Sequence, residues 1–295
     1  MLNRAPRAID WSNPYTVPYC APRPANDAAS KDKIAPTSVR PNSGLTAIYR
    51  RRLLRRIDAM HNSILYWVRA AYRANEPHVA VLAQDANPAN ELKRVVAALK
   101  KRWFTKFDEG ATALGKYFAK SASQRTDAQL QKILKDAGFS VEFKLTAAQQ
   151  DILHATVNEN VNLIKNIPAQ AFHRLEGAVM RSVQTGNDVG SLYKELQEQF
   201  GMDRRRASLI ARDQNSKATA AFNRARQLEV GIEEAIWVHS SAGRQPRPSH
   251  VKAGQAKTKF EVAKGWWDPA VKKYIWPGSE INCRCVSRPI IPGFI

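Results

Sequence analysis

Cysteine, acidic residues and long apolar runs are all scarce in this chain of 295 residues. It has 3 cysteines, two of them separated by a single residue, so we expect no disulfide framework and synthesis in a reducing cytosol. No run of about 18 consecutive apolar residues is present, and the first residues lack the apolar stretch of a signal peptide. Neither a membrane span nor an export signal is therefore expected.

Several catalytic signatures are also missing. The sequence contains no His-Glu-x-x-His zinc-peptidase motif, no Gly-x-Ser-x-Gly nucleophile elbow and no paired set of carboxylates. Asp151, Glu159 and Glu176 are scattered along expected helices, where we expect them to be solvated. These absences argue against an enzyme.

Basic residues greatly outnumber acidic ones, with 46 Lys and Arg against 26 Asp and Glu and a formal net charge of +20. A polyanion such as nucleic acid is the expected partner of such a surface. The excess is spread along the chain, which favours non-specific phosphate contacts over sequence reading. A solvated, solubilising surface is the alternative. The candidate DNA-binding or partner-binding residues are Arg50, Arg51, Arg52, Arg55, Arg56, Arg204, Arg205 and Arg206.

The residue pattern divides the chain into three parts and predicts a mainly α fold. Residues 1–43 are rich in proline and lack a helical period, so we expect an extended arm. Residues 44–230 carry long amphipathic stretches and should form a multi-helix body. Residues 231–295, rich in tryptophan and turn residues, should form a small α+β, loop-rich module.

Within the body, apolar spacing predicts one helix over residues 44–75 and a second from Asn90 to Phe118. Residues 139–145 alternate, which indicates a short strand or an extended connector. A last helix should begin at Asp203. Further helix starts and ends are expected from capping boxes, a first-turn proline and glycines at Thr126, Thr146, Pro168, Gly186, Gly201 and Gly231. Short strands are expected over residues 235–239, 273–276 and 285–291.

Cys283, Cys285 and His250 form the candidate metal site. The two thiols alternate along an extended segment and so lie on the same side of it. Zinc suits such ligands but needs a fourth. The nearest further candidates are His239, Asp268 and Glu280. No spacing selects among them, and the alternative is a pair of small buried thiols beside a histidine that bonds a loop carbonyl. No cofactor other than zinc is expected.

Motifs within residues 160–291 follow one another in the order seen in a known family. They include Leu209 to Asn215, Asn223 and Arg226 on the same helix, Arg247-Pro248-Ser249-His250, Gly254-Gln255, and Asn282-Cys283-Arg284-Cys285. In these motifs the chain resembles the Mu F-like phage head morphogenesis proteins, which are minor head or minor capsid proteins of tailed bacteriophages. One departure is that the family usually carries an Asp seven residues before the histidine, where Gly243 stands here.

The resemblance implies a minor structural protein of the virion, bound at the portal vertex inside the capsid. Such a protein takes part in head assembly in the host cytoplasm and contacts packaged DNA non-specifically; ejection with the DNA is left open. The implied partners are the portal protein, a major capsid or scaffold protein and double-stranded DNA, with no membrane in the mature head. A phage-associated metal-dependent nuclease or hydrolase and a non-specific DNA-binding protein are the alternatives. The residues assigned to a structural motif, several of them expected to bond helix to module, are Arg212, Asp213, Asn223, Arg247 and Asn282.

Overall fold

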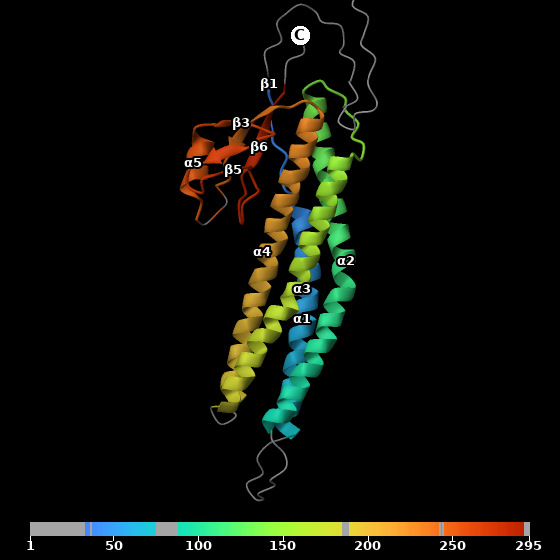
Figure 1. The fold of residues 1–295 in the computed structure, drawn as a ribbon, viewed down its shortest axis with the longest axis vertical. Helices are drawn as coiled ribbons and strands as arrows, with labels where there is room; N and C mark the ends of the chain where they lie inside the picture. The colour runs from blue at the N-terminus through green and yellow to red at the C-terminus, as the bar shows by residue number, and fades with distance from the viewer. Residues whose placement is uncertain are drawn as a thin grey trace, which may run out of the picture.

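The computed structural model describes residues 33–291 apart from residues 36, 75–87, 185–188, 242 and 244. Within these ranges, a body of long helices carries a small β-rich module beside its last helix (Figure 1). The expected mainly α fold with a small α+β C-terminal module is therefore confirmed. Most of the expected Pro-rich arm lies outside the described residues.

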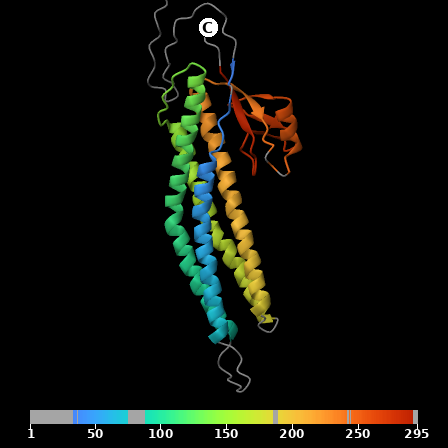
Figure 2. The ribbon, with the colours of Figure 1, turned by 180° about the vertical axis from the view of Figure 1, so that it is seen from behind.

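The body is a bundle of antiparallel helices that run alternately down and up its long axis (Figures 1 and 2). Its helices are α1 (Ser43–Ala74), α2 (Pro88–Asp136), α3 (Ala147–Gln184) and α4 (Val189–Glu229). In α1 the buried residues recur at helical spacing, as in Leu53, Ile57 and Met60, and the other helices supply Phe107, Phe172 and similar residues to the same core. None of the helices in the described ranges has a stretch both long and apolar enough to cross a bilayer.

Several expected helix boundaries are wrong. Thr126 lies inside α2, Pro168 inside α3, and both Gly201 and Asp203 inside α4, so no helix begins or ends at these residues. Local capping and breaking preferences are worth about 1 kcal/mol for glycine and about 3 kcal/mol for proline. A continuous apolar face packed along a whole bundle outweighs them, because most helix stability in proteins comes from tertiary packing. Gly186 lies outside the described residues.

Other local predictions are confirmed. The first helix has the expected extent, and Thr146 accepts a hydrogen bond from the Gln149 amide at 3.3 Å just where α3 begins. Gly231 has a φ of 74° and follows the end of α4, and only glycine adopts this conformation without strain. Residues 139–145 form the extended connector, with Phe139 and Phe143 packed against the module.

The module is built on a four-stranded antiparallel sheet with the strand order β1-β6-β2-β3, and a separate two-stranded hairpin pairs β4 with β5. The three expected strands are confirmed to within one residue. In chain order its elements are β1 (Lys33–Ile34), β2 (Glu234–Val238), α5 (Pro248–Gln255), β3 (Lys259–Glu261), β4 (Trp266–Asp268), β5 (Lys273–Ile275) and β6 (Val286–Ile291).

The strand β1 comes from the Pro-rich segment and was not expected. It pairs with β6 at the edge of the sheet, and Ala35 continues the pairing by donating its amide to Pro289 O at 3.0 Å. Gln129 then exchanges two 3.0 Å hydrogen bonds with the backbone of Arg40. The last residues before α1 therefore join the module to the helical body.

Candidate metal centre and its junction with the helical body

Side chains from separate segments of the module converge on one point. The Cys283 sulfur lies 3.5 Å from His250 Nδ1, and the Cys285 sulfur lies 3.9 Å from the same nitrogen. The Cys285 sulfur is also 3.5 Å from His239 Nδ1. The ligand atoms of Cys283, Cys285 and His250 all lie within 4.8 Å of one another. The structure thus brings together the three predicted residues and adds His239.

The other two candidates for a fourth ligand, Asp268 and Glu280, face other groups. Asp268 Oδ2 lies 3.5 Å from His250 Nε2, the nitrogen that faces away from the thiols. Glu280 pairs with Lys273 at 2.8 Å. Of the three further candidates, His239 is therefore the one placed beside the sulfurs.

The local backbone explains how these side chains meet. His239 follows β2, and His250 lies in the first turn of α5, where Pro248 occupies a favoured position. Gly254 allows this helix to lie against the end of β2, because a Cβ there would be 2.3 Å from the His239 Cβ. Asn282 has a φ of 60°, a left-handed conformation that asparagine tolerates better than most residues, and it directs the chain into Cys283.

Asp268 and aromatic rings surround His250. Asp268 is 0% exposed and accepts hydrogen bonds from Ser249 Oγ at 3.1 Å and from the Ala270 amide at 2.9 Å. The ring of Trp237 lies 5.0 Å from the His250 ring. A carboxylate beside Nε2 favours the tautomer with the proton on that nitrogen, which leaves the Nδ1 lone pair facing the thiols.

Both thiols are free and buried. The pKa of Cys283 is lowered to about 4 because its sulfur accepts a hydrogen bond from Cys285; burial opposes this and His250 supports it. The same hydrogen bond, together with burial, raises the pKa of Cys285. The Gly278 amide also donates to Cys283 at 3.4 Å. The pair therefore favours a singly ionised state, in which one thiol donates a hydrogen bond to the thiolate of the other.

The turn before Cys283 is bonded directly to α4. The Asn282 amide donates to Asp213 Oδ1 at 2.7 Å, and Arg212 donates to Asn282 Oδ1 at 3.3 Å. Lys217 pairs with Asp213 at 3.1 Å on the same helix. Arg247 donates to Ile281 O at 3.0 Å from the other side of the turn. The predicted structural-motif residues thus fix this turn to the body.

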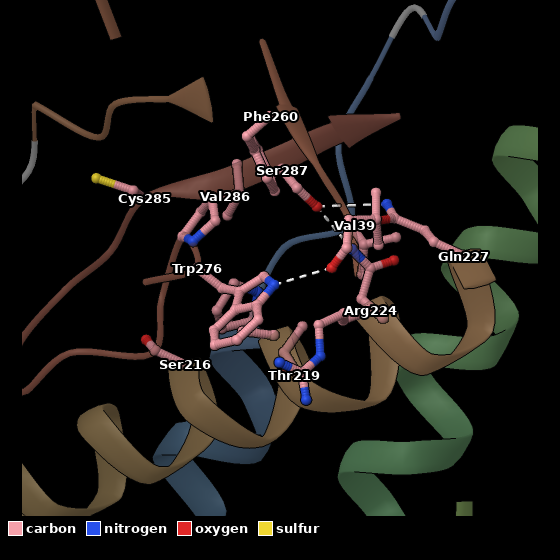
Figure 3. Close-up of a pocket in the computed structure, with 15 residues that line it drawn as sticks. Val39, Ser216, Thr219, Arg224, Gln227, Phe260, Trp276, Cys285, Val286 and Ser287 are labelled. Atoms are coloured by element: carbon pink, nitrogen blue, oxygen red, sulfur yellow. Dashed lines mark hydrogen bonds between the residues drawn. The ribbon is translucent and has the colours of Figure 1, made fainter. Parts of the chain in front are cut away.

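A second junction lies about three helical turns further along α4 (Figure 3). Asn223 donates to Ser287 Oγ at 3.0 Å, and Gln227 donates to the same oxygen at 3.3 Å. The Arg224 guanidinium lies 4.2 Å from the ring of Trp276. A cavity of about 20 Å³ at this junction has the size of a single water molecule. In Figure 3 the Cys285 sulfur is directed away from this cavity, so α4 and the Cys/His cluster occupy different faces of the module.

Arg226, which was not among the predicted site residues, links α4 to α2. It is 2% exposed and holds Asp127 of α2 through two hydrogen bonds of 2.8 and 2.9 Å. It also donates to Lys144 O and to Glu229, both at 2.7 Å. The sequence could have indicated the position of Arg226, because residues three apart such as Asn223 and Arg226 share a helix face. No feature of the sequence indicated that Asp127, 99 residues away, is its partner.

The arginine cluster of α1 divides between exposed and packed side chains. Arg50, Arg51, Arg52 and Arg55 are exposed. Arg52 also lies 3.9 Å from the ring of Tyr117, and the partly buried Arg56 donates to Lys106 O at 3.4 Å. Four arginines of this cluster are therefore exposed, and three of them, Arg50, Arg51 and Arg55, lie on the part of α1 that offers cations to a partner.

The cluster of α4 is mostly engaged within the bundle. Arg204 pairs with Asp58, and Arg206 donates to Gln170. Only Arg205 is exposed to the same degree as the solvent-facing arginines of α1. The two predicted basic clusters thus differ in how many cations they offer to a partner.

A helical bundle whose last helix is bonded to a small Cys/His-containing module is the class of protein that this fold and site define. Residues 173–288 match the family described as Phage Mu protein F like protein. The match confirms the resemblance and includes the whole Cys/His cluster and the α4 residues bonded to it. It supports a phage head-related protein.

One curated relative is an uncharacterized protein of Haemophilus influenzae (strain KW20 / Rd), which is 36% identical over 140 residues. The aligned region covers 47% of this chain and 29% of the relative, so the chain spans less than a third of that protein's length. No solved structure gives a significant match.

Proposed function

We propose that this protein is a minor structural component of a tailed-phage head, bound at the portal vertex inside the capsid. There it takes part in head assembly and contacts the packaged DNA without sequence preference. The observation that carries the proposal is the family match over residues 173–288.

The charge of the chain supports contact with packaged DNA. A formal net charge of +20 favours binding to a dense polyanion, since each phosphate neutralised releases counterions. Arg50, Arg51 and Arg55 present exposed guanidinium groups along α1. Contacts of this kind act on any duplex sequence.

The shape of the body supports a role as a spacer. The 49 residues of α2 correspond to a rod about 70 Å long, at about 1.5 Å per residue. The module lies beside the end of the rod where α4 terminates, and the opposite end is formed by the ends of α1 and α3 (Figure 1). In the proposed role, the Pro-rich arm contacts the portal or capsid proteins, and the exposed arginines of α1 face DNA together with the remaining basic surface.

The nuclease alternative requires a substrate to reach the Cys/His cluster. Cys283 and Cys285 are each 4% exposed and His250 is 2% exposed. A catalytic zinc site keeps an open position for water or substrate. The burial of these residues therefore supports a structural role for the cluster over a catalytic one.

Two experiments test the proposed function. The protein should co-purify with the portal protein when both are produced together. A chain lacking residues 1–32, which keeps β1 and the segment before α1, should lose this association or bind more weakly. In gel-shift assays, it should bind unrelated duplexes equally and release them as salt rises. Failure to bind portal protein in either form, or a preference of about a thousandfold for one DNA sequence, would contradict the proposal.

A further inference from the structure

We propose that His239, His250, Cys283 and Cys285 bind one zinc ion in a closed tetrahedral site that maintains the fold of the C-terminal module. This inference concerns the chemistry of the module and does not depend on the proposed head function. It rests on the distances between the candidate ligand atoms, on the surroundings of His250 and on the segments that these residues join.

The ligand atoms of Cys283, Cys285 and His250 all lie within 4.8 Å of one another, and His239 approaches this group at the Cys285 sulfur. Zinc bonds to sulfur at about 2.3 Å and to nitrogen at about 2.0–2.1 Å, so a tetrahedral site places sulfur and nitrogen ligands about 3.5–3.6 Å apart. The measured separations are 3.5 Å for Cys283 to His250, 3.5 Å for Cys285 to His239, and 3.9 Å for Cys285 to His250. All three approaches are made by Nδ1 atoms.

Hydrogen bonding alone accounts poorly for this arrangement. The Cys285 sulfur lies near two imidazole nitrogens, His239 Nδ1 and His250 Nδ1, but a thiol has a single proton to donate. Cys283 Sγ lies near the second of these nitrogens as well. One cation bound to the two sulfurs and the two Nδ1 atoms would accept a lone pair from each of the four.

The surroundings of His250 are those of a metal ligand. Its Nε2 lies 3.5 Å from Asp268, whose buried carboxylate is held by Ser249 and Ala270. Histidines that bind a metal commonly have a carboxylate or carbonyl at the other ring nitrogen, which fixes the tautomer and the ring orientation. A buried carboxylate also needs positive charge nearby, and a metal-bound imidazole supplies it.

The ligand types select zinc among biological cations. Two thiolates and two imidazoles are the set found in structural zinc sites, whereas calcium and magnesium require oxygen ligands. Because all four positions are filled by protein atoms, the site is structural and leaves no place for a substrate. His239 is half-buried, unlike the other three, and so marks the side from which the ion enters.

The site joins α5 to the end of the paired strands β2 and β6. Val238 pairs with Val286, so His239 and Cys285 follow directly on from this strand pair, and His250 brings in α5. Three strands of the module, β3, β4 and β5, are 3 residues long each. Small units with few long strands commonly depend on a metal for stability, because their apolar core is limited.

Metal analysis of the purified full-length chain tests the proposal. We expect one zinc per chain by mass spectrometry, and after replacement by cobalt an intense visible absorption of tetrahedral cobalt with a thiolate charge-transfer band. Cys283→Ser and His239→Ala should each lower the zinc content at least about tenfold at fixed free zinc. His154→Ala, at an exposed histidine of α3, is the matched control and should retain the metal.

The wild-type measurements remain decisive if a variant fails to fold. A chain with reduced thiols, zinc content far below one per chain and no cobalt spectrum would overturn the proposal. Full zinc content and an unchanged cobalt spectrum in His239→Ala would overturn the four-ligand assignment.

Discussion

The substitution Gly254→Ala offers a sharp test of how the module is packed. Gly254 lies near the end of α5, where alanine is intrinsically favoured over glycine by about 1 kcal/mol. The structure predicts the opposite sign. An added Cβ would lie 2.3 Å from the Cβ of His239 and 2.9 Å from its backbone nitrogen.

The size of the effect follows from these distances. Relief of the contact to an ordinary carbon separation of about 3.5 Å requires a movement of about 1 Å. Backbone is part of the clash, so a rotamer change of His239 cannot remove it. Overpacking of this kind costs about 1–3 kcal/mol. The same movement shifts α5, and with it His250, away from Cys283 and Cys285, so the zinc content should fall as well.

The assay is urea unfolding, followed by the fluorescence of the module's tryptophans, with zinc content measured on the same samples. Gly201→Ala is the matched control, because this glycine lies inside α4 and an added Cβ would meet only the flexible end of Arg205, at 3.4 Å. We expect the control to be neutral or to stabilise by up to about 1 kcal/mol. A Gly254→Ala protein as stable as the wild type, with full zinc content, would refute the proposed packing of α5 on His239.

Three further predictions concern the ties between the module, the body and the DNA. Arg226→Leu should lower the free energy of unfolding in urea by about 3–5 kcal/mol, because Asp127 loses its buried partner; a change below about 1 kcal/mol would contradict this. Asp213→Ala should speed amide hydrogen exchange at Asn282, whose N–H it accepts, while leaving exchange in α1 unchanged; equal protection in both proteins would contradict the junction. Replacing three exposed arginines by glutamine should lower the slope of log binding constant against log salt by up to about 3, with the paired Arg204 and Arg206 as controls; an unchanged slope would exclude this face from DNA contact. These three are Arg50, Arg51 and Arg55.

Features set by neighbouring residues were predictable from the sequence. The periodicity of residues 44–75 located α1, and Gly231 located the end of α4, because a positive φ is a local requirement. Short apolar runs between turn residues located three strands of the module. The Cys-x-Cys spacing placed two sulfurs on one side of an extended segment, and in the structure the predicted His250 lies beside them.

Features set by distant contacts were not predictable. Thr126 and Gly201 carry local signals for helix ends, but continuous packing against neighbouring helices overrides these signals. The pairing of β1 with β6 joins segments from opposite parts of the chain. The choice of His239 over Asp268 as the residue beside the sulfurs depends on the register of β2 against β6, in which Val238 pairs with Val286, and no spacing in the sequence encodes this register.

The central claim is a place at the portal vertex of a phage head, and localisation of the protein in intact virions tests it most directly. Virions carrying an epitope-tagged chain should be labelled with gold after gentle opening of the head, or be imaged by asymmetric cryo-electron microscopy. We expect the protein at one vertex, on the inner side of the portal. A uniform distribution over the shell, or absence from purified virions, would contradict it.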